Sequence, residues 1–204
     1  MSTLDASIAY ATLPDSLVPI RIKVRKLTDV GLLREACAAT VRGLEFSTMT
    51  LDDGYRCEHS PIRTQMFWIQ MLGIPTSVSV HLVRHKHGLE PFVQSNRPDR
   101  GGTADAGRNT PVDHSLIANA QALINVSLKR LCTKAAADTL ATVVCLKHAV
   151  SFVDPDLAKY MVPQCVYRGG VCPERKPCGR YRVRKYNPVA IFEDMIGVDP
   201  RDPW

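Results

Sequence analysis

The segment His81–Lys86 most restricts the folds open to this chain, because it gathers positive charge over a few residues. It reads His-Leu-Val-Arg-His-Lys, and a Ser-x-Arg triplet follows at Ser95 and Arg97. Like charges at such short range repel one another, so the cluster is favourable only beside an anion. Guanidinium groups and hydroxyls are the groups that bind phosphates and pyrimidine edges. The fold must therefore bring this segment to the wall of an anion-binding site.

The composition fits a globular chain with one main core. The 204 residues are 45% hydrophobic and 23% charged, which is ordinary for soluble domains. The net charge of +6 suits anionic ligands such as nucleotides, flavin phosphates or nucleic acid. No apolar run is long enough to span a bilayer, and the start of the chain lacks the pattern of a signal peptide. Seven cysteines, an odd number, then indicate a reducing cytoplasm.

The chain before residue 40 is predicted to be an irregular start, a strand and a helix. Residues 1–18 show no regular pattern. Residues 18–27 alternate apolar and basic side chains, which predicts a half-buried strand. Asp29 is placed to cap the helix that follows.

The middle of the chain is predicted to hold one helix and one long loop. The helix is expected over 60–72, with Ser60 as its cap and a proline in its first turn. Residues 76–83 are rich in Val, Ser and Thr and fit either a strand or a helix. Residues 97–113 are predicted to be a polar loop, a kind of segment that is often functional when it is this long.

The remainder is predicted to be helical and then rich in turns. A long amphipathic helix is expected over 115–134, a second over roughly 135–152, and a short third helix from Asp154. Turn-forming residues dominate 161–186, and the basic and aromatic run 180–186 fits a strand with a solvated face better than a nucleic-acid contact.

Three polar residues on the predicted helix 115–134 form a second candidate site. Asn119 and Arg130 are eleven residues apart, close to three whole turns, so they are expected to project from nearly one face. Asn125 lies between them, about a third of a turn around the helix. Two amides and a guanidinium on one helix could bind a flavin ring and a nucleotide base together. Each of the three alone also fits a solvated helix surface.

These motifs resemble the flavin-dependent thymidylate synthases. The signature of that family reads Arg-His-Arg, seven residues, then Ser-x-Arg; here Lys86 replaces the third basic residue and the spacing to Ser95 is one residue longer. The Asn-x5-Asn-x4-Arg spacing of Asn119, Asn125 and Arg130 resembles the family's C-terminal helix. The stretch 58–63 loosely resembles a flavin-contacting segment, with a shift.

The resemblance implies a fold, a reaction and a set of ligands. The fold would be α+β, with a central, mostly antiparallel sheet packed with long helices. Residues 1–160 would form the family-like domain, and 161–204 a Cys-rich irregular tail packed on it. A homotetramer would bind FAD and dUMP across subunit interfaces, with NADPH and methylenetetrahydrofolate as co-substrates. The enzyme would be a methyltransferase that makes dTMP without a cysteine nucleophile.

The resemblance also implies a role for each matched residue. Arg130 would be catalytic, polarising the pyrimidine. The residues expected to bind the substrate are His81, Arg84, Ser95, Arg97 and Arg130. Those expected to bind the flavin are Ser60, Arg84, His85, Lys86, Asn119 and Asn125.

Two departures from the family concern the substrate. His81 stands where the family has the Gln that reads the pyrimidine edge, and imidazole offers a different hydrogen-bonding geometry. The family's phosphate-gripping Arg is missing, and Arg100 and Arg108 in the loop are the candidates to replace it. A related pyrimidine, or a hydroxymethyl product, therefore stays open. Short relatives of this kind suggest a bacteriophage protein working in the host cytoplasm.

The cysteines of the tail form a candidate metal site. Cys165, Cys172 and Cys178 lie in a Pro- and Gly-rich segment, with Cys132 or His148 as a fourth ligand for zinc or an iron–sulfur cluster. Their spacing is wider than that of zinc fingers, so partly buried free thiols are the favoured alternative. The competing class for the whole protein is a non-catalytic nucleotide- or nucleic-acid-binding protein with a metal-stapled tail. Nucleic acid is the less expected of its ligands.

Overall fold

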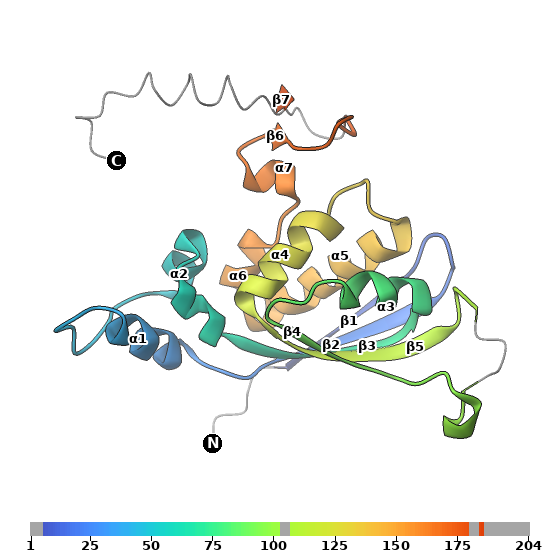
Figure 1. The fold of residues 1–204 in the computed structure, drawn as a ribbon, viewed down its shortest axis with the longest axis horizontal. Coiled ribbons are helices and arrows are strands. Elements are labelled where there is room, and N and C mark those ends of the chain that lie inside the picture. The colour runs from blue at the N-terminus through green and yellow to red at the C-terminus, as the bar shows by residue number, and fades with distance from the viewer. Residues whose placement is uncertain (1–5, 103–106, 180–183, 186–204) are drawn as a thin grey trace.

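The computed structural model describes residues 6–102, 107–179 and 184–185, and its centre is a five-stranded antiparallel sheet (Figure 1). The strand order is β1-β2-β3-β5-β4, and each neighbouring pair is antiparallel. The strands are β1 (Ala6–Thr12), β2 (Pro19–Lys26), β3 (Met66–Pro75), β4 (Leu89–Val93) and β5 (Pro111–Asn119). The predicted α+β class with a mostly antiparallel sheet is confirmed.

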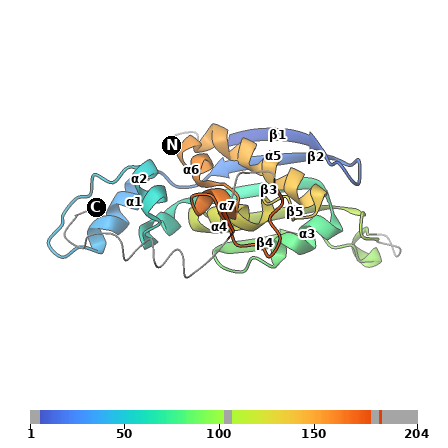
Figure 2. The ribbon, with the colours of Figure 1, turned by 90° about the horizontal axis from the view of Figure 1, so that it is seen from above.

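Helices cover one face of this sheet (Figures 1 and 2). The covering helices are α3 (Thr76–Val83), α4 (Ala120–Arg130), α5 (Ala137–Val153) and α6 (Pro155–Tyr160). Beside the sheet lie α1 (Val30–Ala39), α2 (Leu51–Cys57) and the 3₁₀ helix η1 (Ser60–Thr64). The remaining elements are the 3₁₀ helix η2 (Pro98–Arg100), α7 (Gln164–Tyr167) and the short parallel pair β6 (Val171–Cys172) and β7 (Arg184–Lys185). In Figure 1, α7 and β6 rise from the helical layer next to α4.

Predictions that rest on local signals are confirmed. In β2 the side chains of Ile20, Ile22 and Val24 are buried and those of Arg21, Lys23 and Arg25 are more exposed, as the alternation over 18–27 predicts. Asp29 caps α1 by accepting from the backbone N–H of Gly31 and Leu32. Asp154 caps α6 in the same way, and 76–83 proves to be a helix.

The helix predicted over 60–72 is wrong. Only η1 is helical, and from Met66 the chain forms β3, in which Phe67, Ile69 and Met71 are fully buried. Gln65 ends the 3₁₀ turn, and its side chain donates to the backbone carbonyl of Asp29. Pairing with both β2 and β5 outweighs the helix signal of the first residues.

The helix predicted over 115–134 begins five residues too early. Residues up to Asn119 belong to β5, where Leu116 and Ala118 are buried and their neighbours are less so. Asn119 is the N-cap of α4: its Oδ1 accepts from the N–H of Ala122 at 2.9 Å. Asn119 and Arg130 therefore do not share a helix face.

Two further stretches are more ordered than predicted. Within the start, expected to be irregular, Ala6–Thr12 forms the edge strand β1. The polar loop 97–113 ends early, because Pro111 already pairs with Pro75 across β5 and β3.

An ion pair in the core ties three elements together. Lys26 Nζ in β2 lies 2.7 Å from Asp154 Oδ2, and the hydroxyl of Tyr55 in α2 donates to the same oxygen at 2.7 Å. Both Tyr55 and Asp154 are buried. Burial of Tyr55 and then the negative charge of Asp154 raise the pKa of Tyr55, so the phenol stays protonated.

No helix in the described ranges has the length and apolar character that crossing a membrane requires.

Candidate functional site

The guanidinium of Arg130 joins α4 to the last turn of α3. Its Nε donates to Nε2 of His85 at 3.0 Å, and one terminal nitrogen donates to the backbone carbonyl of His81 at 2.8 Å. A guanidinium has five N–H donors, so these two bonds leave others for a ligand. The structure thus brings together the basic cluster and Arg130, which are 45 to 49 residues apart in sequence.

Charge and burial fix the protonation states at this junction. Burial and then the positive charge of Arg130 lower the pKa of His85. Its Nε2 accepts a hydrogen bond, so the neutral ring carries its proton on Nδ1. Burial and the nearby Arg84 also lower the pKa of Arg130. Two cations and a half-buried histidine in one place form a site that an anionic ligand would stabilise.

A polar pocket of about 390 Å³ lies next to this junction, and we call it the amide pocket. Three of the six residues expected to bind flavin line it, namely Lys86, Asn119 and Asn125. They come from the α3–β4 turn, the end of β5 and the middle of α4. The other lining residues are Arg63, His87, Gly88 and Gln121.

Gly88 and Asn119 touch at the wall of the amide pocket. Gly88 has φ +72°, and its carbonyl accepts from the N–H of Asn119 at 2.9 Å. A Cβ on Gly88 would lie 2.8 Å from Cγ of Asn119, closer than real Cβ atoms approach. The turn therefore requires glycine, which leaves room for the amide that both caps α4 and lines the pocket.

A second pocket, of about 280 Å³, contains His81, and we call it the His81 pocket. Nδ1 of His81 lies 2.8 Å from the hydroxyl of Thr139. Arg108 lines the same pocket, and its carbonyl accepts from the N–H of Ser77 at 3.0 Å. Burial first, then Arg130, Arg84 and Arg108, lower the pKa of His81. The other lining residues are Asp15, Val78, Asn109, Ala136 and Asp138.

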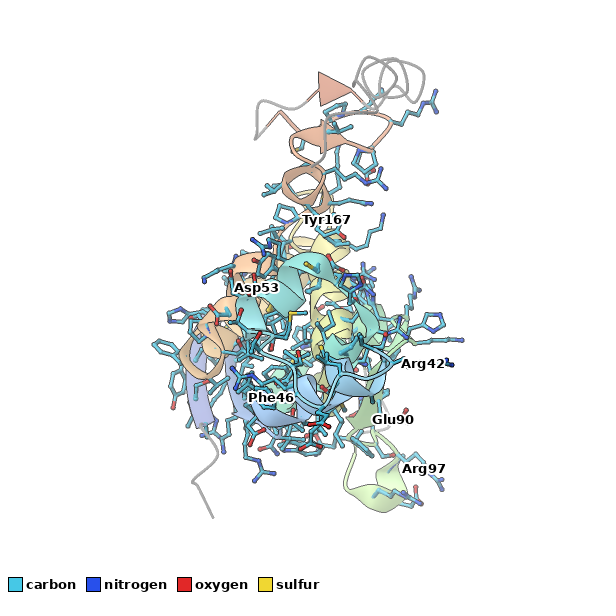
Figure 3. The ribbon with its side chains drawn as sticks, turned by 90° about the vertical axis from the view of Figure 1, so that its left-hand side faces the viewer. Arg42, Phe46, Asp53, Glu90, Arg97 and Tyr167 are labelled. Atoms are coloured by element: carbon cyan, nitrogen blue, oxygen red, sulfur yellow. The ribbon has the colours of Figure 1, made fainter. Side chains whose placement is uncertain are left out.

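Ser95 and Arg97 lie away from this junction. Arg97 is exposed and makes a two-pronged contact with Asp99, at 2.9 and 2.8 Å. In Figure 3 it is at the opposite end of the molecule from Tyr167 in the tail. The Ser-x-Arg triplet is near the start of α3, where Asn96 contacts Thr76, whereas the basic cluster is at its end. Eight helical residues rise about 12 Å, so one copy of the chain does not join the two halves of the signature.

Two other predicted residues contribute less than expected. Ser60 is exposed in η1 and is not among the residues that line the amide pocket. Arg84 caps the end of α3 and is exposed, acting on His81 and Arg130 through its charge.

All four cysteines of the predicted metal site line one pocket of about 340 Å³, which we call the cysteine pocket. Arg130 and Lys129 line it too. The seven cysteines all lie in described ranges, and none forms a disulfide. As the described side chains stand, no three of the His, Cys, Asp and Glu residues are close enough together to hold a metal ion.

The arrangement matches solved structures of one family. Thymidylate Synthase X (ThyX) from Helicobacter pylori with FAD and dUMP superposes with a TM-score of 0.51 at 14% identity, over 76% of this chain and 100% of that one. This chain has the fold of a flavin-dependent thymidylate synthase. A further structure of ThyX from the same organism, complexed with FAD and dUMP, gives a TM-score of 0.49 at 15% identity, over 64% and 95%. No family model and no curated protein matches the sequence.

The sequence interpretation missed four residues that line the amide pocket. Arg63 and Gln121 face the amide pocket from elements whose boundaries were predicted wrongly. His87 and Gly88 directly follow the basic cluster, and the lone glycine at that turn was a usable signal.

Proposed function

We propose that this chain is an FAD-dependent enzyme that transfers a one-carbon unit to C5 of a pyrimidine deoxynucleotide. The observation that carries the proposal is the hydrogen bonding of Arg130 to the segment 81–85, which adjoins both pockets. Arg130 bonds to the backbone of His81, which lines one pocket, and to His85, the neighbour of Lys86 in the other. A flavin and a nucleotide in these pockets would both lie beside the segment that this guanidinium holds.

The amide pocket suits a flavin by its donor set. Asn119, Asn125 and Gln121 offer both donors and acceptors, which the edge of an isoalloxazine ring needs. Lys86 and Arg63 offer cations for the phosphates. Its volume of 390 Å³ is within the usual range of small-molecule sites, about 300–1,000 Å³. These residues would hold the flavin in place.

The His81 pocket suits the nucleotide. We assign the phosphate to Arg108, because its charge acts on His81 and its backbone is hydrogen-bonded to the start of α3. Arg130 would put a fixed positive charge where negative charge develops on the pyrimidine carbonyl. His81, a neutral imidazole here, would contact the base edge. Bound FAD supplies the redox chemistry, with NADPH as reductant and methylenetetrahydrofolate as one-carbon donor.

The separation of Ser95 and Arg97 from Arg130 favours an assembly with shared sites. If copies pair so that the Ser-x-Arg triplet of one approaches the basic cluster of another, both halves of the signature meet one ligand. The homotetramer implied by the family resemblance has this property. We therefore propose a tetramer as the active form, with Arg97 exchanging Asp99 for a ligand phosphate.

The test is the visible absorbance spectrum of the purified protein, followed by an assay of its enzymatic activity. We expect the purified protein, reconstituted with FAD, to be yellow and to release flavin on denaturation. With NADPH and methylenetetrahydrofolate it should convert dUMP. dCMP is assayed in parallel, because His81 stands where the family has the Gln that reads the pyrimidine edge. A protein that binds dUMP but no FAD would instead support the non-catalytic nucleotide-binding protein.

A further inference from the structure

Four cysteines from separate segments line the cysteine pocket. Cys132 follows the end of α4, Cys165 is in α7, Cys172 is in β6, and Cys178 lies in the turn after it. The other three cysteines, Cys37, Cys57 and Cys145, are absent from its lining. The pocket therefore selects four of the seven cysteines, and these four connect the tail to the helix that carries Arg130.

Tight turns bring the tail cysteines together. Between Cys165 and Cys172 the chain reverses at Gly169 and Gly170, with φ +59° and +91°. The N–H of Gly170 donates to the carbonyl of Cys165 at 2.8 Å, which closes the turn. Cys178 is followed by Gly179 at φ +75°. Glycines at positive φ next to cysteines let the backbone fold around a small centre.

The tail is also fixed to α4 by side chains. Lys129 Nζ donates to Oε1 of Gln164 at 2.8 Å, so the residue before Cys165 is tied to the last turn of α4. Cys132, Cys165 and Cys172 all line the pocket at this junction, so their sulfur groups face one space. Without a counter-charge, gathered thiolates repel.

Cations surround this pocket. Its lining includes Lys129, Arg130 and Lys134. A divalent ion with four thiolates carries a net charge of −2, and these side chains would offset it. One carboxylate, that of Glu174, also lines the pocket, so the wall carries a net charge of +2 that thiolates around a metal ion would balance.

We propose that Cys132, Cys165, Cys172 and Cys178 bind a structural Zn²⁺ ion that staples the tail onto the end of α4. Four thiolates with no open position are the ligand set of closed, structural zinc sites. Binding requires the sulfurs to close in on the ion, which is usual because metal sites are rarely fully formed beforehand. The ion would hold the last turn of α4, and with it Arg130, in place.

The test is metal analysis of the full-length protein after incubation with Zn²⁺ and desalting. We expect about one zinc per chain, released when the thiols are modified. With Co²⁺ instead, intense visible bands of a tetrahedral thiolate complex should appear. Flavin content is measured on the same sample, so loss of zinc and loss of flavin are distinguished.

Serine variants locate the site. Cys165→Ser and Cys172→Ser should each reduce zinc content at least about tenfold after desalting. Cys57→Ser, on α2 and outside the pocket, is the matched control and should bind zinc fully. Circular dichroism and flavin binding establish that each variant is folded.

Either of two results would overturn the proposal. One is a folded wild-type protein that retains no zinc or cobalt, with all four thiols as reactive as Cys57. The other is a brown protein with stoichiometric iron and inorganic sulfide, which would assign these thiolates to an iron–sulfur cluster.

Discussion

Arg130 donates a hydrogen bond from Nε to Nε2 of His85, 3.0 Å away, and this bond survives only while His85 is neutral. The ring is held in that state by burial and by the guanidinium itself, which lower its pKa. The histidine of the basic cluster therefore orients the arginine, and it does not add a third positive charge.

Arg130→Ala should abolish turnover and leave the fold intact. We expect at least about a hundredfold loss of kcat, because a preorganised charge at the pyrimidine carbonyl would be missing. Arg42→Ala, a change at an exposed residue that lines neither pocket, is the control. Steady-state kinetics with circular dichroism provide the measurement, and unchanged turnover would remove Arg130 from the mechanism.

Arg108→Ala should weaken nucleotide binding, whereas Arg100→Ala should not. Arg108 lines the His81 pocket, while Arg100 is exposed in η2 and does not line it. Loss of a charge-assisted phosphate contact should raise the Kd for dUMP about tenfold to a hundredfold. Isothermal titration measures both variants, and the phosphate assignment fails if deoxyuridine and dUMP lose affinity equally.

Gly88→Ala should impair flavin binding more than Gly101→Ala does. Both glycines have positive φ, +72° and +81°, so both substitutions strain the backbone. Only at Gly88 does the new methyl meet Asn119, since nothing lies within 4 Å of a Cβ at Gly101. Fluorescence titration with FAD should show at least about a tenfold higher Kd for Gly88→Ala. Equal affinities in the two variants would place Asn119 outside the flavin site.

Lys26→Met should strongly destabilise the protein. It leaves the carboxyl group of Asp154, 1% exposed, without its cation, and such a loss costs about 3 kcal/mol. Arg56→Met removes an exposed pair with Asp53 and should change little. Chemical denaturation of both variants gives the comparison. If the two variants have the same denaturation midpoint, the buried pair contributes no more stability than a surface pair.

Stability should fall as the pH is lowered from 7 toward 4, in part through His114. Its ring is buried, with Nδ1 2.9 Å from the Ser79 hydroxyl, and in the described structure Nε2 has no hydrogen-bonding partner. Burial lowers its pKa to about 4, so the unfolded chain takes up the proton first. The stabilisation is fully present above the unfolded pKa, about 6.5, and up to about 3 kcal/mol is lost below it.

His114→Gln should therefore flatten the decline of unfolding free energy between pH 7 and 4. His148→Gln, on the exposed side of α5, should keep the wild-type slope. Urea denaturation at several pH values measures both. A slope for His114→Gln equal to that of the wild type would mean that another group carries the dependence.

Local chemistry explains what the sequence predicts well. Asp29 and Asp154 cap helices because a carboxylate binds the N–H groups that follow it directly, whatever the rest of the chain does. The strand at β2 was readable because a sheet with one covered face leaves strict alternation. The residue types at 86, 119 and 125 indicated a shared site, and they do line one pocket.

Contacts between distant segments explain the failures. Ile117 fits a helical stripe as well as a strand, and only the neighbouring strands β3 and β4 decide between them. The same holds for β1, which is a strand because it pairs with β2. Arg108 reaches His81 because the loop is hydrogen-bonded to the start of α3. Such pairings have no local signal in one sequence.

The short edge strand β4 restricts how copies of this chain can associate. It has five residues, and the middle one is Pro91, which has no N–H to give to an added strand. A sheet continued across two molecules at this edge would lack a hydrogen bond at its centre. Self-assembly at this side must therefore use side-chain packing rather than backbone pairing, which also guards the edge against fibrous aggregation.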